Sequence, residues 1–225
     1  MMRMALTQRE LRRGDALRTS LMPAFASRAF FLVFLALSAT PLAAQTPDTT
    51  DPKAVRSGTY ALDAGHTRVV WSLSHRGFST YSGLLPAASG MLVLDPAKPE
   101  ASRVEVTLNS ADVATADPRF DPRLKGPDYF NAAAFPTLTF ASSAVKVEGS
   151  RAQVTGTLTF LGQSRPVTLD VTFHKAGINP TDKLYHVGFD ATGTLTRSDF
   201  GLKTGLPGIG DAVKLQIEAE FTQKE

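Results

Sequence analysis

Four histidines are the residues of this sequence best suited to bind a metal ion or to exchange protons near neutral pH: His66, His75, His174 and His186. The chain contains no cysteine, and no two histidines stand at the spacing that would put two metal ligands on one helix face. A zinc site would therefore need several strands to converge. The sequence predicts no bound metal and no other cofactor.

Charged side chains gather in two other segments. The first contains Arg123, Lys125 and Asp128, and the second contains Arg197 and Asp199. In such segments arginine and aspartate usually tie loops together through ion pairs or backbone hydrogen bonds. The alternative is that Arg123 or Arg197 contacts a phosphate-bearing head group, because a guanidinium fork suits phosphate. We expect the structural role and keep both arginines as candidate head-group contacts.

Signals of catalysis are weak. The run GLPGIG at 205–210 has the glycines of a phosphate-binding loop, but it precedes a predicted strand, whereas such a loop needs a following helix. The sequence has no G-x-S-x-G nucleophile elbow. None of the inward-facing strand positions identified below is Asp or Glu. We therefore predict that the protein is not an enzyme.

The charge of the chain is unevenly distributed. The 225 residues carry 24 Lys+Arg and 21 Asp+Glu, but six arginines and only two acidic residues lie in residues 1–44. There a basic stretch precedes an apolar run at 29–37 and a small-residue exit near Ala44, an order typical of a secretory signal peptide. It begins at Met1 or at Met22, and its cleavage predicts a periplasmic or secreted protein. The remaining chain is nearly neutral, so no nucleic-acid partner is expected.

The rest of the sequence predicts a polar, flexible lead-in at 45–57 and one domain at 58–225, in which apolar and polar residues alternate. A period of two indicates half-buried antiparallel strands with one apolar face each. Residues 116–134 do not alternate, and within them residues 119–129 predict a short helix or an irregular lid. The predicted strands are 58–63, 66–75, 82–95, 102–110, 136–148, 151–161, 164–175, 184–198 and 211–222.

Nine such strands must bury their apolar faces, and the two economical arrangements are a sandwich and a closed barrel. The strands are long for a sandwich. Glycines lie inside them, where a barrel needs bends or close approach: Gly83, Gly90, Gly156, Gly188 and Gly193. We therefore predict an all-β fold, an extended antiparallel barrel of about eight strands with a short helical lid segment. A barrel of this size either fills with its own side chains or holds one ligand.

Several segments, taken together in their order and spacing, resemble the YceI-like family of periplasmic, lipocalin-like polyisoprenoid-binding proteins. The resemblance covers roughly residues 58–222. The segments that carry it are YALD (60–63) with GHT (65–67), VWSLSHRG (70–77), GLLPAASG (83–90) with LVLD (92–95), DPRLK (121–125), PDYF (127–130) with FPTLTF (135–140), GTLTF (156–160), RSDFG (197–201) and GDAVKL (210–215).

The resemblance implies a lipocalin-like barrel of eight strands, capped by the helical segment, with a long apolar cavity for an isoprenoid chain. His75 falls on the inward face, either as an ordinary partly buried histidine or as a polar contact for a head group. Val93 and Val171 lie on the same predicted face. The candidate ligand-binding residues are Trp71, Leu73, His75, Met91, Val106, Leu108, Phe130, Phe135, Leu138, Phe140, Leu158, Phe160, Leu169, Phe189, Leu195, Leu215 and Ile217.

The leading hypothesis is an exported protein that carries or stores an isoprenoid lipid, of the polyprenyl or quinone type, without catalysis and with transient membrane contact. One alternative is an enzyme or enzyme accessory that acts on an amphiphile such as a fatty-acid amide at the barrel mouth; polar residues deep in the cavity would favour it. Another is a barrel filled by its own side chains that serves as an interaction module. The identity of the lipid and the oligomeric state, a dimer included, stay open.

Overall fold

The structure is a computed structural model that describes residues 48–224. The predicted signal peptide at 1–44 lies outside the described residues. Within the described part of the chain, no helix has the length and apolar character needed to cross a membrane.

Ten strands make up most of the fold. Nine are the predicted strands, with ends that differ from the sequence-based bounds by at most three residues. The other is the two-residue β5, which is too short to show a period. The strands are β1 (Gly58–Leu62), β2 (Arg68–His75), β3 (Ser79–Leu94), β4 (Arg103–Asn109), β5 (Ala114–Thr115), β6 (Thr137–Glu148), β7 (Arg151–Phe160), β8 (Gln163–Ile178), β9 (Tyr185–Thr196) and β10 (Ala212–Gln223).

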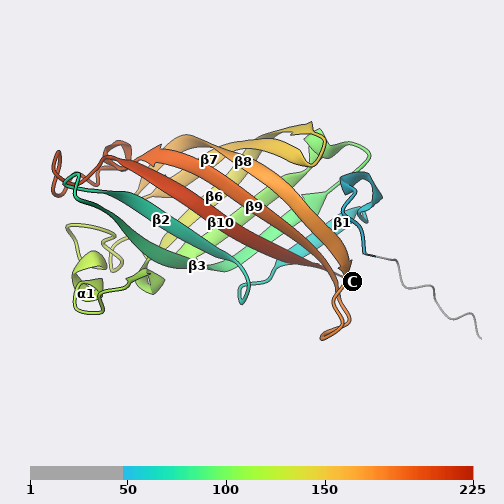
Figure 1. Cartoon of the computed structure of the whole chain (residues 1–225), viewed down its shortest axis with the longest axis horizontal. Helices are drawn as coiled ribbons and strands as arrows, with labels where there is room; N and C mark the ends of the chain where they lie inside the picture. The colour runs from blue at the N-terminus through green and yellow to red at the C-terminus, as the bar shows by residue number, and fades with distance from the viewer. Residues whose placement is uncertain (1–47, 225) are drawn as a thin grey trace, which may run out of the picture. The chain divides into compact units, whose positions relative to one another are not determined.

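Eight of these strands close into an antiparallel barrel (Figure 1). Around the ring the order is β2, β3, β4, β6, β7, β8, β9 and β10, and β10 pairs back to β2. The closing β9–β10 ladder is long, from Thr196 opposite Ala212 to His186 opposite Thr222. The predicted all-β barrel of about eight strands is confirmed.

Strands β1 and β2 occupy one position in the ring, one after the other. β2 pairs with the first half of β3 and the first half of β10, whereas β1 pairs with the last residues of both. The break between them falls at Thr67, whose side chain restores the lost ladder. Its Oγ1 donates to the Glu220 carbonyl oxygen at 3.2 Å and accepts from the Glu220 N–H at 3.0 Å.

A β-bulge in β3 lies beside this break. The β3–β4 register shifts between Ala87 and Ser89, and one extra residue on a strand inverts which side chains face inward. Ala87 faces the interior before the bulge, as expected from alternation, but Leu92 does so after it. The prediction that Met91 and Val93 face inward is therefore wrong: both point outward and are about 40% exposed, at 38% and 41%.

The segment at 48–57 packs on the barrel, unlike the flexible lead-in expected there. Thr49 forms an isolated antiparallel bridge with Ala176, in which the two N–H···O bonds are 2.8 and 2.9 Å long. Asp51 caps the short 3-10 helix η1 (Pro52–Ala54) by accepting from the Lys53 N–H. Val55 is buried in a core cluster together with Tyr60 of β1 and Leu92 of β3. We call residues 48–57 the strap.

Two strand glycines make room for aromatic rings of the interior. Gly83 lies opposite Trp71 in the β2–β3 ladder, under its indole ring. Gly156 in β7 lies under the ring of Phe140. A glycine here allows the ring to lie flat on the neighbouring strand, as the sequence predicted for close approach inside a barrel.

Replacing Gly83 by alanine is expected to lower the free energy of unfolding by about 1–3 kcal/mol, because the new Cβ would overlap the Trp71 indole and lie 2.7 Å from the Ala114 carbonyl oxygen. Equilibrium urea unfolding measures the change. Gly188→Ala in β9 is the matched control, since the only atom near its Cβ is the Lys175 carbonyl oxygen at 3.9 Å. That variant should be neutral or slightly stabilised. Equal losses in both variants would contradict the steric explanation.

Candidate ligand-binding cavity

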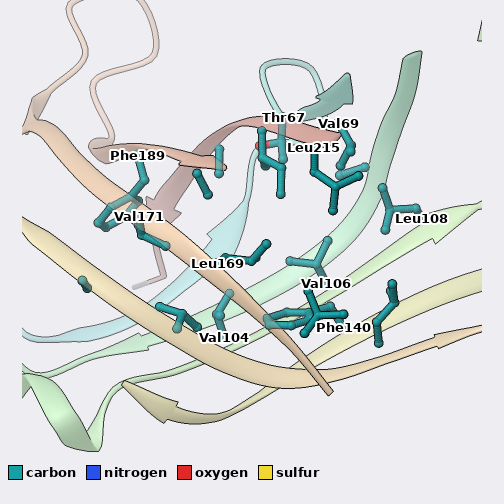
Figure 2. Close-up of a pocket in the computed structure, with 18 of the residues that line it drawn as sticks. Thr67, Val69, Val104, Val106, Leu108, Phe140, Leu169, Val171, Phe189 and Leu215 are labelled. Atoms are coloured by element: carbon teal, nitrogen blue, oxygen red, sulfur yellow. The ribbon is translucent and has the colours of Figure 1, made fainter. Parts of the chain in front are cut away.

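The barrel encloses a cavity of about 1420 Å³. Every strand of the ring contributes to its wall, and Figure 2 shows side chains of different strands, such as Val69, Phe140, Leu169 and Leu215, around one space. Alternation explains the wall, because every second residue of each strand must point inward. The cavity contradicts the alternative of a barrel filled by its own side chains.

The structure places most of the predicted ligand-binding residues on this wall. Whether they touch a ligand stays a prediction. Val171, from the same predicted face, also lines the cavity. The predicted residues that line it are Trp71, Leu73, His75, Val106, Leu108, Phe130, Leu138, Phe140, Leu158, Phe160, Leu169, Phe189, Leu195, Leu215 and Ile217.

Two predicted residues lie elsewhere. Met91 is on the outer face of β3 because of the bulge described above. Phe135 precedes the first residue of β6, so the alternation of that strand does not govern it. Its ring packs against Gly162 in a shallow surface depression, and its carbonyl oxygen accepts from Ser110 Oγ at 2.6 Å.

Sequence reasoning also missed part of the wall. One group of missed residues lies on strand faces that alternation already indicated as inward, so these residues could have been predicted. The position of the bulge hid a second group, Leu92 and Leu94. A third comes from the lid and its neighbouring loops, which have no period. The missed residues include Val69, Val104, Val154, Val167, Val213 and Phe221 in the first group and Phe120, Leu124, Tyr129, Leu202 and Ile209 in the third.

The lid lies at one end of the barrel, at the left of Figure 1, where Phe120, Leu124 and Tyr129 line the cavity. Its only α-helix is the single turn α1 (Asp121–Leu124). The Asp121 carboxylate fixes this turn by accepting from the Thr115 N–H at 2.9 Å and from Thr115 Oγ1 at 2.7 Å. Phe120 contacts Tyr81 and Tyr129 edge-to-face, with ring centroids 5.9 and 5.5 Å apart. This aromatic row joins the lid to the barrel wall.

Arg197, a candidate head-group contact, is buried at the lid end and holds the turn at 202–210. Its guanidinium donates to four backbone carbonyl oxygens, those of Leu202, Thr204, Ile209 and Gly210, at 2.8–3.0 Å. Burial lowers the pKa of Arg197, and the nearby Asp211 carboxylate opposes this effect. The hydrogen bonds match the structural role that the sequence favoured, although Arg197 also forms part of the cavity wall.

Arg123, the second candidate, lies outside the cavity wall. Its side chain is exposed, and its guanidinium stands 5.8 Å from the ring centroid of Tyr129. Residue 123 is on the solvent side of α1, while Leu124 faces the core. A one-turn helix can present only one of these neighbours inward. Arg123 is therefore not part of the cavity wall, and its contact with a head group stays a prediction.

We call the opposite end of the barrel the mouth. There the wall is continued by the strap, by the loop that includes η2 (Pro99–Ala101), and by the β6–β7 turn, at the right of Figure 1. Several residues of the wall at this end are exposed to solvent, among them Lys53, Ala97, Val147 and Arg151.

Two of the four histidines, His66 and His186, lie beside Glu220 of β10. His75 ends β2 at the lid end, where it lines the cavity and is exposed. His174 forms an exposed ion pair with Asp190, with Nε2 and Oδ1 2.6 Å apart. His66 and His186 lie on the outer wall, and His186 is only 8% exposed.

Comparison with known proteins identifies relatives along nearly the whole described domain. A sequence profile of the YceI-like domain matches residues 60–221. A UPF0312 protein of Pseudomonas savastanoi is 35% identical over 169 residues, which are 74% of this chain and 87% of the relative. Protein YceI of Escherichia coli O157:H7 is 33% identical over 160 residues, 71% of this chain and 83% of the relative. The crystal structure of Burkholderia cenocepacia BcnA is similar with a TM-score of 0.61 and 25% identity, over 71% of this chain and 98% of that protein.

Replacing Arg197 by lysine is expected to lower the free energy of unfolding by about 3 kcal/mol, because one ammonium group cannot satisfy the separate carbonyl oxygens that the guanidinium bonds. Urea unfolding measures the loss. Arg123→Lys, on the exposed face of α1, should change stability by less than about 0.5 kcal/mol. If Arg197→Lys were as stable as the Arg123 variant, the structural role of Arg197 would be refuted.

Proposed function

The chain belongs to the YceI-like family, and we propose that it is an exported, non-catalytic protein that carries or stores a long isoprenoid lipid, of the polyprenyl or quinone type, in its barrel. The observation that carries the proposal is the cavity itself. At about 1420 Å³ and with a mainly apolar wall, it exceeds the roughly 300–1,000 Å³ of ordinary small-molecule pockets. Such a space suits one long apolar chain.

Energetics indicate reversible carriage. Removing a five-carbon isoprene unit from water gains roughly 4 kcal/mol, at about 0.8 kcal/mol per carbon, so a few units would approach the ceiling of about 20 kcal/mol for non-covalent binding. A long prenyl chain, however, is never free in water. Its alternative environment is a membrane, which is equally apolar, so the net free energy of transfer into the barrel is small. The protein would therefore exchange its lipid with membranes.

The polar groups of the cavity favour carriage over catalysis. Its wall contains two carboxylates, Asp95 beyond the end of β3 and Asp117 between β5 and α1, and these lie at opposite ends of the barrel. Asp95 accepts from two backbone N–H groups, and Asp117 pairs with Arg119. The buried Thr67 is likewise engaged with the backbone of Glu220. The alternative of an enzyme acting on an amphiphile would require polar groups deep inside that are left available for chemistry.

The signal-peptide pattern at 1–44 supports export, with cleavage near Ala44 and a periplasmic or secreted mature protein. The mature chain would carry 18 basic and 19 acidic residues, so general attraction to nucleic acid is not expected. Contact with a membrane would be transient and confined to lipid exchange. These features describe a shuttle or a reservoir for a lipid outside the cytoplasm.

Protein purified gently from a bacterial periplasm should carry one long-chain lipid, visible by native mass spectrometry as an added mass that organic extraction removes. Ala191→Phe should reduce this occupancy severalfold, because Ala191 lines the cavity and a ring there would fill it. Thr192→Phe, one residue further along β9 and exposed, should keep the lipid. Only apo mass in the native protein, or equal occupancy in the two variants, would overturn the proposal.

Exchange through the mouth predicts a second effect. Val147→Asp near the end of β6 should slow transfer of a fluorescent prenol from the protein to phosphatidylcholine vesicles by several fold, because Val147 is an exposed apolar part of the wall at the mouth. Phe78→Asp is the control, since Phe78 is 89% exposed but lies in the β2–β3 turn at the lid end. A slower transfer in the Phe78 variant, with the Val147 variant unchanged, would place exchange at the lid.

A further inference from the structure

A cluster of metal-ligating side chains lies on the outer wall of the barrel, away from the cavity. Asp63 and His66 come from the break between β1 and β2, and Glu220 comes from β10. Their ligand atoms all lie within 4.8 Å of one another. Ala219 and Phe221 line the cavity, so Glu220 between them points outward. The sequence predicted that only a convergence of strands could build a metal site, and such a convergence occurs here.

The local backbone holds the first two groups in place. Asp63 Oδ1 accepts from the Gly65 N–H at 2.9 Å, and Asp63 Oδ2 contacts His66 Nδ1 at 2.8 Å. The Asp63 N–H donates to the Glu220 carbonyl oxygen at 2.8 Å, which ties the turn to β10. His66 and Asp63 therefore stay beside Glu220 although His66 is exposed to solvent.

A second layer of groups orients the third ligand. His186 Nδ1 contacts Glu220 Oε1 at 2.5 Å, and His186 Nε2 contacts Asp182 Oδ2 at 2.8 Å. His186 is nearly buried, so this chain of contacts fixes one oxygen of Glu220 and leaves the other for a further partner. Hydrogen-bonded partners behind the ligands are a regular feature of metal sites in proteins, where they set ligand orientation.

The charge of the cluster also favours a cation. Asp63, Asp182 and Glu220 bring three carboxylates together, and their ion-pair partners within 4 Å among the described residues are His66 and His186. Arg68 is close enough for its positive charge to act on His66, but it forms no ion pair with these carboxylates.

We propose that Asp63, His66 and Glu220 form a binding site for a divalent transition-metal ion of the Zn²⁺ type. One nitrogen and two carboxylate oxygens are a donor set that Zn²⁺ accepts, with water as a fourth ligand. At metal–ligand distances of about 2.0–2.1 Å the donor atoms of a tetrahedral site are roughly 3.3 Å apart, so small side-chain rotations close the cluster. Mg²⁺ and Ca²⁺, which prefer oxygen ligands only, should bind poorly.

Metal binding here would stabilise the barrel wall at the break between β1 and β2. The break between β1 and β2 interrupts the barrel wall at Thr67, and a metal ion would link the turn beside it to β10. The inference does not rest on the proposed lipid function, because none of the three ligands lines the cavity.

Titration of the metal-free protein with ZnCl2 by isothermal calorimetry should show one saturable site per chain. His66→Gln and Glu220→Gln should each weaken Zn²⁺ binding by at least about tenfold, and His186→Gln should weaken it by a smaller factor through misorientation of Glu220. His174→Gln is the matched control, because His174 pairs with Asp190 on the outer wall without a third ligand. Circular dichroism confirms that each variant is folded, and Asp63→Asn replaces any variant that is not.

The proposal is also tested by thermal unfolding with and without Zn²⁺. The wild-type protein and His174→Gln should gain several degrees in Tm with Zn²⁺ and nothing with Mg²⁺, whereas His66→Gln should gain nothing. No saturable site in the wild type, unchanged Zn²⁺ affinity in His66→Gln, or equal losses in His66→Gln and His174→Gln would overturn the assignment.

Discussion

Closure of the sheet is the constraint on which the rest of the domain depends. Each long strand has one apolar face, and pairing of β9 with β10 turns these faces onto one enclosed volume. The number of strands and their stagger then set how wide that volume is. In this ring the side chains coat the wall without filling the centre, which leaves a cavity of about 1420 Å³. An open sheet with the same alternation would need a second layer to cover its apolar face, and it would have no interior to occupy.

Closure is accommodated by two irregularities that lie side by side. The break between β1 and β2 and the bulge in β3 meet at Thr67, whose carbonyl oxygen accepts from the Ala87 N–H at 3.1 Å. On its other side Thr67 bonds to the backbone of Glu220. The same place therefore decides which residues of β3 face inward and where Asp63 and His66 leave the wall. The interior surface and the outer His–carboxylate cluster share one structural origin.

The sequence predicted well those features that depend on neighbouring residues, and it missed those that depend on the rest of the fold. Alternation is local, so the strands and most of the cavity wall were predicted correctly, as at Val106, Leu108 and Leu215. It fails at Met91, where four consecutive apolar residues from Met91 to Leu94 hide the inversion caused by the bulge. It also fails at Phe135, which stands just outside its strand. The position of Arg197 among four carbonyl oxygens depends on the irregular turn at 202–210, which has no period. The meeting of Glu220 with His66 depends on residues distant in the chain.

The difference between the two ends of the barrel has a consequence for which molecules fit. Aromatic rings and a turn fastened by Arg197 cover the lid end, whereas the mouth has solvent-exposed side chains on its wall. If a chain entered this tube end-on through the mouth, the covered lid end would limit how far it could extend into the cavity. Chains of different length would then differ in how much of them stays outside. Selection by length can thus come from the architecture of the container, without any contact that reads chemical identity.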